Sequence, residues 1–478
     1  MNIKQQAISG AKWTTVATIT TAVVQILRLS ILTRFLAKAD FGIVAILTFI
    51  LGLTNTFADL GFSTAIMHKT GLTRKEFSSL YWIQFLLFII LFIIGSFFSP
   101  IIAKFYDEAS ISYLLPIVLL DLIFNGFGRL YDTILQKEMC FKTIAIRNII
   151  SSIVSLVFAF VFAVLGVGIY SLILSTLLNT LILNTWNLIS GQKHMKIQLY
   201  VSVRESLPLA KIGIYQTGTQ ILDYFAAKFD VLIIGKLLGS EALGVYNLAK
   251  ELVMKVILLV NSIVNKVALP LFAKVQSDHE TLRKTYCRVL SILSRVNFPV
   301  SAAICVFSVQ IVRLLYGPGY EEVSDIMTIL TFWSVFICIG NPVGSIGIAT
   351  GKTNLSFVYT IVRILITIPL MYLASTISIT AVAWCNVLVA FILFLVGWKM
   401  LLNRMIELPF GEYVSSFKTQ LLIAMVVGIP LFFLVKSDLL SISGNVIMEV
   451  ILYGAIFVIM YLIISLIIEG KSFYKILR

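Results

Sequence analysis

Apolar residues form long runs along this chain, and each run is about as long as a bilayer is thick. A membrane-spanning helix needs roughly 20 apolar residues. Fourteen segments meet this length, at approximately residues 11–36, 41–67, 77–103, 112–134, 143–166, 168–190, 209–236, 242–268, 287–313, 323–349, 355–375, 378–401, 415–436 and 445–469. The pattern predicts an all-α polytopic membrane protein with about 14 transmembrane helices.

Two of these helices carry a polar stripe with the same spacing. The first stripe consists of Thr14, Thr18, Thr21, Gln25 and Arg28. The second follows at an offset of 202 residues and consists of Gln216, Gln220, Asp223, Ala227 and Asp230. Spacings of 4, 3, 4 and 3 place each stripe on one helix face. A polar face in a membrane must contact protein or water, so the matching stripes predict two related halves around a shared cavity, as in a transporter.

The repeat continues beyond these first helices. Residues 101–105 resemble residues 310–314, and Arg147 corresponds to Arg363. Six spans separate the two copies, so both enter the membrane in the same direction, which predicts a parallel pseudo-twofold repeat. We expect three parts, namely an N-terminal six-helix lobe over 1–195, a C-terminal six-helix lobe over 205–403 and an additional helix pair over 415–470.

Composition agrees with a membrane protein. The chain is 59% hydrophobic and only 13% charged, whereas a soluble domain carries about 25% charged residues. The net charge is +14, but the basic residues are scattered between apolar runs, which excludes a nucleic-acid interface. Connections on the side of the two termini carry most of the Lys and Arg, so the positive-inside rule predicts that both termini are cytoplasmic.

The sequence predicts no cofactor, no metal site and no enzyme activity. The five cysteines show no paired spacing, and the three histidines lie in connections without ligand spacing. Residues 347–353 look like a phosphate-binding loop, but Ile346 stands where that motif needs its first glycine. We therefore expect that this chain does not use ATP. Its short outer connections also argue against a membrane glycan polymerase or ligase.

Several short motifs point to a known family. Leu32–Leu36 leads through a short turn to Asp40–Gly42, and Phe57–Ser63 ends the second span. Further matches are Leu243–Asn247 and Ala349–Thr353. With these motifs the chain resembles the flippases for lipid-linked O-antigen, capsule and exopolysaccharide units. They form the polysaccharide-transporter branch of the multidrug/oligosaccharidyl-lipid/polysaccharide exporter superfamily.

The resemblance implies two six-helix lobes around a central cavity that opens alternately to either side. It implies a bacterial inner-membrane protein that moves an undecaprenyl-pyrophosphate-linked glycan to the outer leaflet, with membrane lipids and polysaccharide polymerase machinery as further partners. In the related peptidoglycan-precursor flippases, arginines on the first helix face the cavity, and Arg28 stands where one of them would. In the second span this chain departs from those flippases, because residues 54–56 are not basic. The alternative is a cation-coupled multidrug exporter of the same superfamily, whose cavity would be more acidic or aromatic.

Candidate substrate ligands are the polar or cationic residues within the spans, namely Arg28, Gln25, Lys228, Gln220 and Arg363. The guanidinium of Arg28 could bind a pyrophosphate in a bidentate manner, or it could extend to the membrane surface. Lys228 lies two residues from Asp230 and points to another face, as a second cavity cation or a helix–helix contact. Arg147 and Arg363 either extend to the cytoplasmic surface or form a basic entrance.

Asp223 and Asp230 are the candidate ion-coupling residues, because carboxylates within a membrane are rare and usually functional. Asp230 occupies the repeat position of Arg28. The two could form a salt bridge between the halves, or Asp230 could bind a proton or another cation. Glu251 and Lys255 are spaced i, i+4, which predicts an ion pair on one helix.

Overall fold

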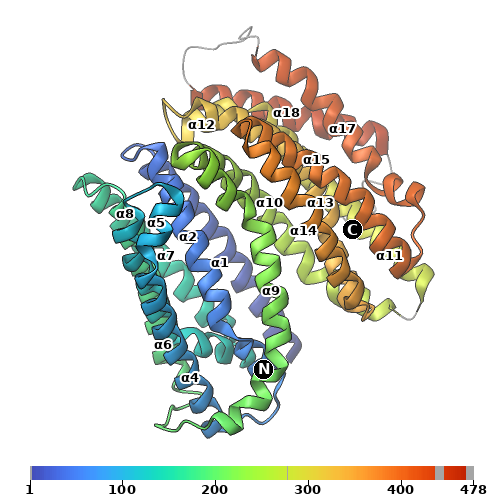
Figure 1. Ribbon diagram of the computed structural model, residues 1–478. Helices are drawn as coiled ribbons and strands as arrows, with labels where there is room; N and C mark the ends of the chain where they lie inside the picture. The colour runs from blue at the N-terminus through green and yellow to red at the C-terminus, as the bar shows by residue number, and fades with distance from the viewer. Residues whose placement is uncertain (1–2, 277, 437–445, 470–478) are drawn as a thin grey trace. The chain divides into compact units, whose positions relative to one another are not determined.

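The computed structural model describes residues 3–276, 278–436 and 446–469, and every regular element in these ranges is a helix (Figure 1). The chain divides into two compact units, Met1–Gly244 and Val245–Arg478. The predicted all-α class is therefore confirmed. The three part boundaries expected from the sequence stay a prediction.

The first unit holds nine helices and the start of a tenth. The second of these helices is ended by Leu60 and Gly61, which are both in left-handed conformation. The nine are α1 (Ile3–Leu32), α2 (Lys38–Asp59), α3 (Phe62–His68), α4 (Arg74–Phe97), α5 (Ser99–Tyr106), α6 (Ile111–Lys137), α7 (Phe141–Val164), α8 (Tyr170–Gly191) and α9 (Val203–Leu237). Helix α6 is central, because it contacts α2, α4, α5 and α8. Helix α1 packs on α7, and α9 packs on α2.

The remaining helices belong to the second unit, except that α10 begins in the first. They are α10 (Gly239–Val275), α11 (His279–Val306), α12 (Ser308–Leu315), α13 (Glu321–Ala349), α14 (Thr353–Ser375), α15 (Ile379–Gly397), a π-helical turn (Trp398–Leu402), α16 (Asn403–Ile406), α17 (Phe410–Lys436) and α18 (Val446–Glu469). An apolar core with Tyr286, Phe298 and Phe417 joins α11 to α17.

Within the described residues, twelve helices are long and apolar enough to cross a membrane. Their outward side chains are large and apolar, for example Phe97 and Ile467, each 76% exposed. Such extensive exposed apolar surface is expected where lipid replaces water. The other two expected spans correspond to α9 and α10, parts of which lie outside the described side chains. The chain is a multi-pass membrane protein, and the count of fourteen stays a prediction.

The structure confirms the internal repeat. Short helices α5 and α12 have the same length and are offset by 209 residues. Each begins at a buried serine, and each serine bonds to the next long helix. Ser99 Oγ donates to the Ser112 carbonyl at 2.9 Å, and Ser308 Oγ accepts from Thr328 Oγ1 at 2.9 Å. Helix α13 contacts α11, α12 and α15, as α6 contacts α4, α5 and α8.

Three predicted spans differ from the structure. The sequence predicted continuous helices over 41–67, 77–103 and 287–313, but each is a long helix followed by a short one. The first is interrupted by Leu60 and Gly61, which are in left-handed conformation. In the second Pro100 explains the break, because its nitrogen cannot donate a helical hydrogen bond and it is favoured in a first helical turn.

Candidate functional site

The polar stripe on α1 is mostly satisfied by its own helix. The hydroxyls of Thr14, Thr18 and Thr21 each donate to a backbone carbonyl four residues earlier, at 2.8 Å. Such local bonds leave a threonine little capacity to bind a ligand as a donor. Gln25 is exposed and Arg28 is half-buried.

Two hydroxyls from neighbouring helices contact Arg28. Its Nη1 donates to Ser155 Oγ on α7 at 3.4 Å and to Thr176 Oγ1 on α8 at 3.3 Å. Ser155 Oγ in turn donates to the backbone carbonyl of Ser175 at 2.7 Å, which fixes its position. These contacts direct the guanidinium toward α7 and α8 within the first unit.

The stripe on α9 becomes more buried toward the end of the helix. Gln216 lies outside the described side chains, Gln220 is exposed and Asp223 is half-buried. Asp230 is only 5% exposed, and its Oδ1 accepts from the backbone N–H of Val231 at 2.9 Å. Burial of a carboxylate within a membrane span costs free energy, and such residues are usually functional or paired.

Tyr224 fixes α9 against α2, beside Asp223. Its hydroxyl donates to the Phe49 carbonyl at 3.1 Å, and its ring stacks on that of Phe49 with centroids 6.0 Å apart. A Cβ at Gly52 would lie 2.1 Å from the Tyr224 hydroxyl, so only glycine leaves room for it. Lys228, one turn further along α9, is exposed.

Arg363 lies on α14 in the second unit, half-buried and one turn after Tyr359. The Tyr359 hydroxyl donates to the backbone carbonyl of Leu393 on α15 at 3.2 Å. The predicted pair on α10 is confirmed, because Lys255 Nζ lies 2.9 Å from Glu251 Oε2. Arg147, the repeat partner of Arg363, does not extend to the membrane surface. It is buried, and its Nη1 lies 2.9 Å from Asp132 Oδ1.

Two charged residues of α6, Asp121 and Arg129, were not among the candidate site residues predicted from the sequence. Asp121 is 5% exposed and accepts from Asn125 Nδ2 at 2.5 Å. Arg129 Nε donates to Asp59 Oδ1 on α2 at 3.0 Å. Both lie inside the span predicted at 112–134. The rule that flagged Asp230, that ionisable groups within a membrane are rare, would have found them.

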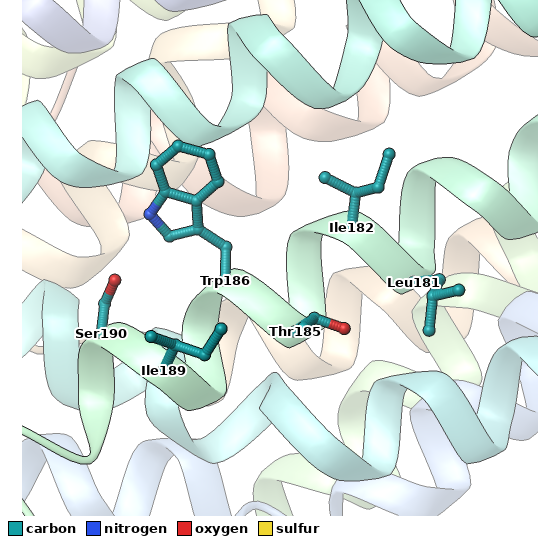
Figure 2. Close-up of a pocket in the computed structure, with 6 residues that line it drawn as sticks. All are labelled: Leu181, Ile182, Thr185, Trp186, Ile189 and Ser190. Atoms are coloured by element: carbon teal, nitrogen blue, oxygen red, sulfur yellow. The ribbon is translucent and has the colours of Figure 1, made fainter.

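A depression of about 530 Å³ lies along one face of α8 (Figure 2). Six residues line it, namely Leu181, Ile182, Thr185, Trp186, Ile189 and Ser190. The lining is mostly apolar and uncharged. It therefore suits an apolar chain better than a phosphate, which requires cationic or N–H donors.

Comparison with known proteins identifies the family. The family model described as "Polysaccharide biosynthesis protein" matches residues 31–325, more than half of the chain. The chain belongs to the polysaccharide biosynthesis protein family. The resemblance found in the sequence motifs is thereby confirmed, and family and fold together point to a membrane transporter.

Two curated relatives and one solved structure support the assignment. Teichuronic acid biosynthesis protein TuaB of Bacillus subtilis is 26% identical over 438 residues, 90% of this chain and 89% of TuaB. Lipopolysaccharide biosynthesis protein WzxC of Escherichia coli is 24% identical over 77% of this chain and 75% of WzxC. The lipid II flippase MurJ in an inward closed conformation aligns with a TM-score of 0.79 and 17% identity, over 96% of this chain and 99% of MurJ. At that identity the MurJ likeness shows a common fold.

Proposed function

We propose that this protein is a flippase that moves a lipid-pyrophosphate-linked oligosaccharide from the cytoplasmic to the outer leaflet of the bacterial inner membrane. Family membership and relatives named for teichuronic acid and lipopolysaccharide biosynthesis support a glycan cargo. The fold shared with a lipid II flippase supports translocation of a lipid-linked substrate by alternating access. Both termini are cytoplasmic in this proposal, and polysaccharide polymerase machinery receives the product.

The observation that carries the proposal is the position of Arg28. A guanidinium inside a membrane span requires anionic or polar partners. The hydroxyls of Ser155 and Thr176 hold it on the polar side of α1. An oriented guanidinium presents a planar fork that matches two phosphate oxygens at once. In this proposal Arg28 binds the pyrophosphate, and further polar groups of the first unit, namely Gln25, Gln220 and Lys228, bind the head group or the first sugars.

Energy for the cycle comes from an ion gradient in this proposal. Asp223 and Asp230 lie on the polar face of α9, and a carboxylate there can take up a proton or another cation. The rival function, export of cationic drugs, is less favoured. A cationic drug would be repelled by Arg28 and by the exposed Lys228, whereas an anionic lipid head group is attracted to both.

Export of glycan by cells that carry Arg28 variants tests this function. We expect Arg28→Ala to lower export about 10- to 150-fold, because a hydrogen bond to a charged group contributes about 1.5–3 kcal/mol. Arg28→Lys should recover only part, since an ammonium lacks the planar fork. Arg313→Ala, on the exposed face of α12, is the matched control and should export normally. Normal export by Arg28→Ala at wild-type membrane level would contradict the proposal.

A further inference from the structure

Asp121 is a buried carboxylate that the proposed cargo site does not use. It lies ten residues after the start of α6 at Ile111, which places it about 15 Å along a membrane-spanning helix. Only 5% of its surface is exposed. A group at this depth and burial cannot be stabilised by bulk water.

Neutral side chains from three helices surround Asp121. Asn125 Nδ2 donates to Asp121 Oδ2 at 2.5 Å and lies 3.4 Å from Asn55 Oδ1 on α2. Asn184 Nδ2 on α8 donates to Asn125 Oδ1 at 3.0 Å. The side chains of Asn55 and Thr180 also interact with the carboxyl group. We call Asp121 with Asn55, Asn125, Thr180 and Asn184 the amide cluster.

The cationic side chains near the amide cluster are paired with other carboxylates. Arg129, two turns further along α6, lies 3.0 Å from Asp59 on α2. Arg147 on α7 lies 2.9 Å from Asp132. Asp121 itself takes part in none of the ion pairs found among the described residues. Arg129 also attracts Asp121 electrostatically, but its guanidinium forms its ion pair with Asp59. The hydrogen-bond partners of Asp121 are all neutral.

A buried carboxylate without a direct ion-pair partner is costly and is normally neutralised by a proton. We propose that Asp121 is a proton-binding site of the transport cycle, occupied while the amide cluster is closed to water. A protonated carboxyl group is both a donor and an acceptor. It therefore suits a cluster of amides, which also both donate and accept.

The fold does not require a polar cluster at this position. The buried residues of α6 and α13 match at an offset of 212, for example Leu114 with Ile326 and Val118 with Leu330. At this offset the counterpart of Asp121 is Trp333, whose ring lies beneath Lys250 at 5.5 Å. The counterpart of Asn125 is Ile337. The second half builds the same helix packing without a carboxyl group.

The coupling role of this site rests on the proposed flippase function, whereas proton binding itself does not. Loss of the proton leaves a charge that favours a conformation in which water reaches the amide cluster. Uptake of the proton removes that charge and favours the closed cluster. Proton exchange at Asp121 would therefore bias the two access states of the carrier without contact with the cargo.

Infrared spectroscopy of the purified full-length protein in lipid nanodiscs tests proton binding directly. We expect a carbonyl-stretch band of a protonated carboxylic acid at neutral pH, lost in Asp121→Asn and kept in Asp325→Asn. The control residue is an exposed aspartate of α13. The band should be the same in sodium and in choline buffers. A band that disappears in sodium buffer, or sodium binding that is lost in Asp121→Asn, would identify a sodium site and overturn the proposal. The absence of any such band would also overturn it.

A second measurement needs no variant and guards against misfolding of Asp121→Asn. Apolar carbodiimides react with protonated carboxyl groups in membranes, and mass spectrometry locates the adduct. We expect Asp121 of the wild-type protein to be modified at neutral pH and the reaction to slow as the pH rises. An unmodified Asp121 would contradict the proposal. Either result leaves the Arg28 export test unaffected, so failure of the proton site and failure of the flippase function can be told apart.

Discussion

Gly42 and Gly244, which are 202 residues apart, form a reciprocal backbone contact at the crossing of α2 and α10. A Cβ at Gly42 would lie 1.8 Å from the Ser240 carbonyl oxygen, and a Cβ at Gly244 would lie 1.9 Å from the Lys38 carbonyl oxygen. The repeat offset maps Gly42 onto Gly244 and Lys38 onto Ser240. Equivalent residues thus meet each other's backbone, as in an isologous interface.

Side chains of α5 and the turn after it support the same crossing. Lys236 Nζ lies 2.8 Å from Asp107 Oδ2 and above the Phe105 ring, and the Ser240 hydroxyl donates to Glu108. The Lys236 pair is exposed, so its own contribution is at most about 1 kcal/mol. The close glycine contact is therefore the part of the crossing that substitution should disturb most.

We predict that Gly42→Ala destabilises the protein by about 1–3 kcal/mol, because an added methyl group must displace a backbone carbonyl and cannot be relieved by a rotamer change. Thermal unfolding of the purified protein measures the effect. Gly340→Ala is the matched control, since no neighbouring atom lies within 4 Å of its Cβ position. Equal stability of the two variants would show that the helices separate easily at the crossing.

The repeat and the all-helical membrane fold could be predicted because they depend on hydropathy and spacing alone. The stripes and the Glu251–Lys255 pair follow from regular helical periodicity. The correspondence of α5 with α12 follows from the resemblance of residues 101–105 to residues 310–314. The hydrogen bonds of Arg28 could not be predicted, since Ser155 and Thr176 are remote in sequence and only packing of α1 against α7 and α8 brings them near. The amide cluster has the same origin, because its members come from three helices.

Orientation in the membrane is a second prediction, made from the distribution of Lys and Arg. In a variant without its five native cysteines, Thr376→Cys should react with an impermeant thiol reagent added to intact cells. Lys193→Cys should react only after the membrane is opened. Both positions are exposed in the structure, so a difference in labelling reports the side of the membrane. The reverse pattern would invert the topology.

Thr176 is predicted to position Arg28 for cargo binding. Thr176→Val removes one of the two hydroxyls that contact the guanidinium and nearly preserves side-chain volume. Loss of one hydrogen bond of about 1 kcal/mol should lower export about fivefold. In the Arg28→Ala background the same change should have no further effect, because the group that Thr176 positions is gone.

Thr15→Val is the control for this prediction, because the Thr15 hydroxyl donates to a carbonyl of its own helix and lies off the stripe. The control should export at the wild-type level. A fivefold loss from Thr176→Val that persists in the Arg28→Ala background would show that Thr176 acts independently of Arg28.

The last prediction concerns Arg28 and Asp230, which the 202-residue offset makes equivalent. Asp230 lies near the end of α9, as Arg28 lies near the end of α1. If the two attract each other during the cycle, Arg28→Ala and Asp230→Ala should each reduce the amount of protein in the membrane. The loss in the double variant should be smaller than the sum of the two single losses, which corresponds to a coupling of about 0.5–3 kcal/mol.

The charge exchange, Arg28→Asp with Asp230→Arg, should restore the membrane level, because the attraction is kept. It should not restore export, because the cation no longer lies beside Ser155 and Thr176. Immunoblots of membranes and surface glycan measure the two quantities separately. Strictly additive losses, together with failure of cysteines at 28 and 230 to cross-link under any condition, would show that the two stripes do not meet.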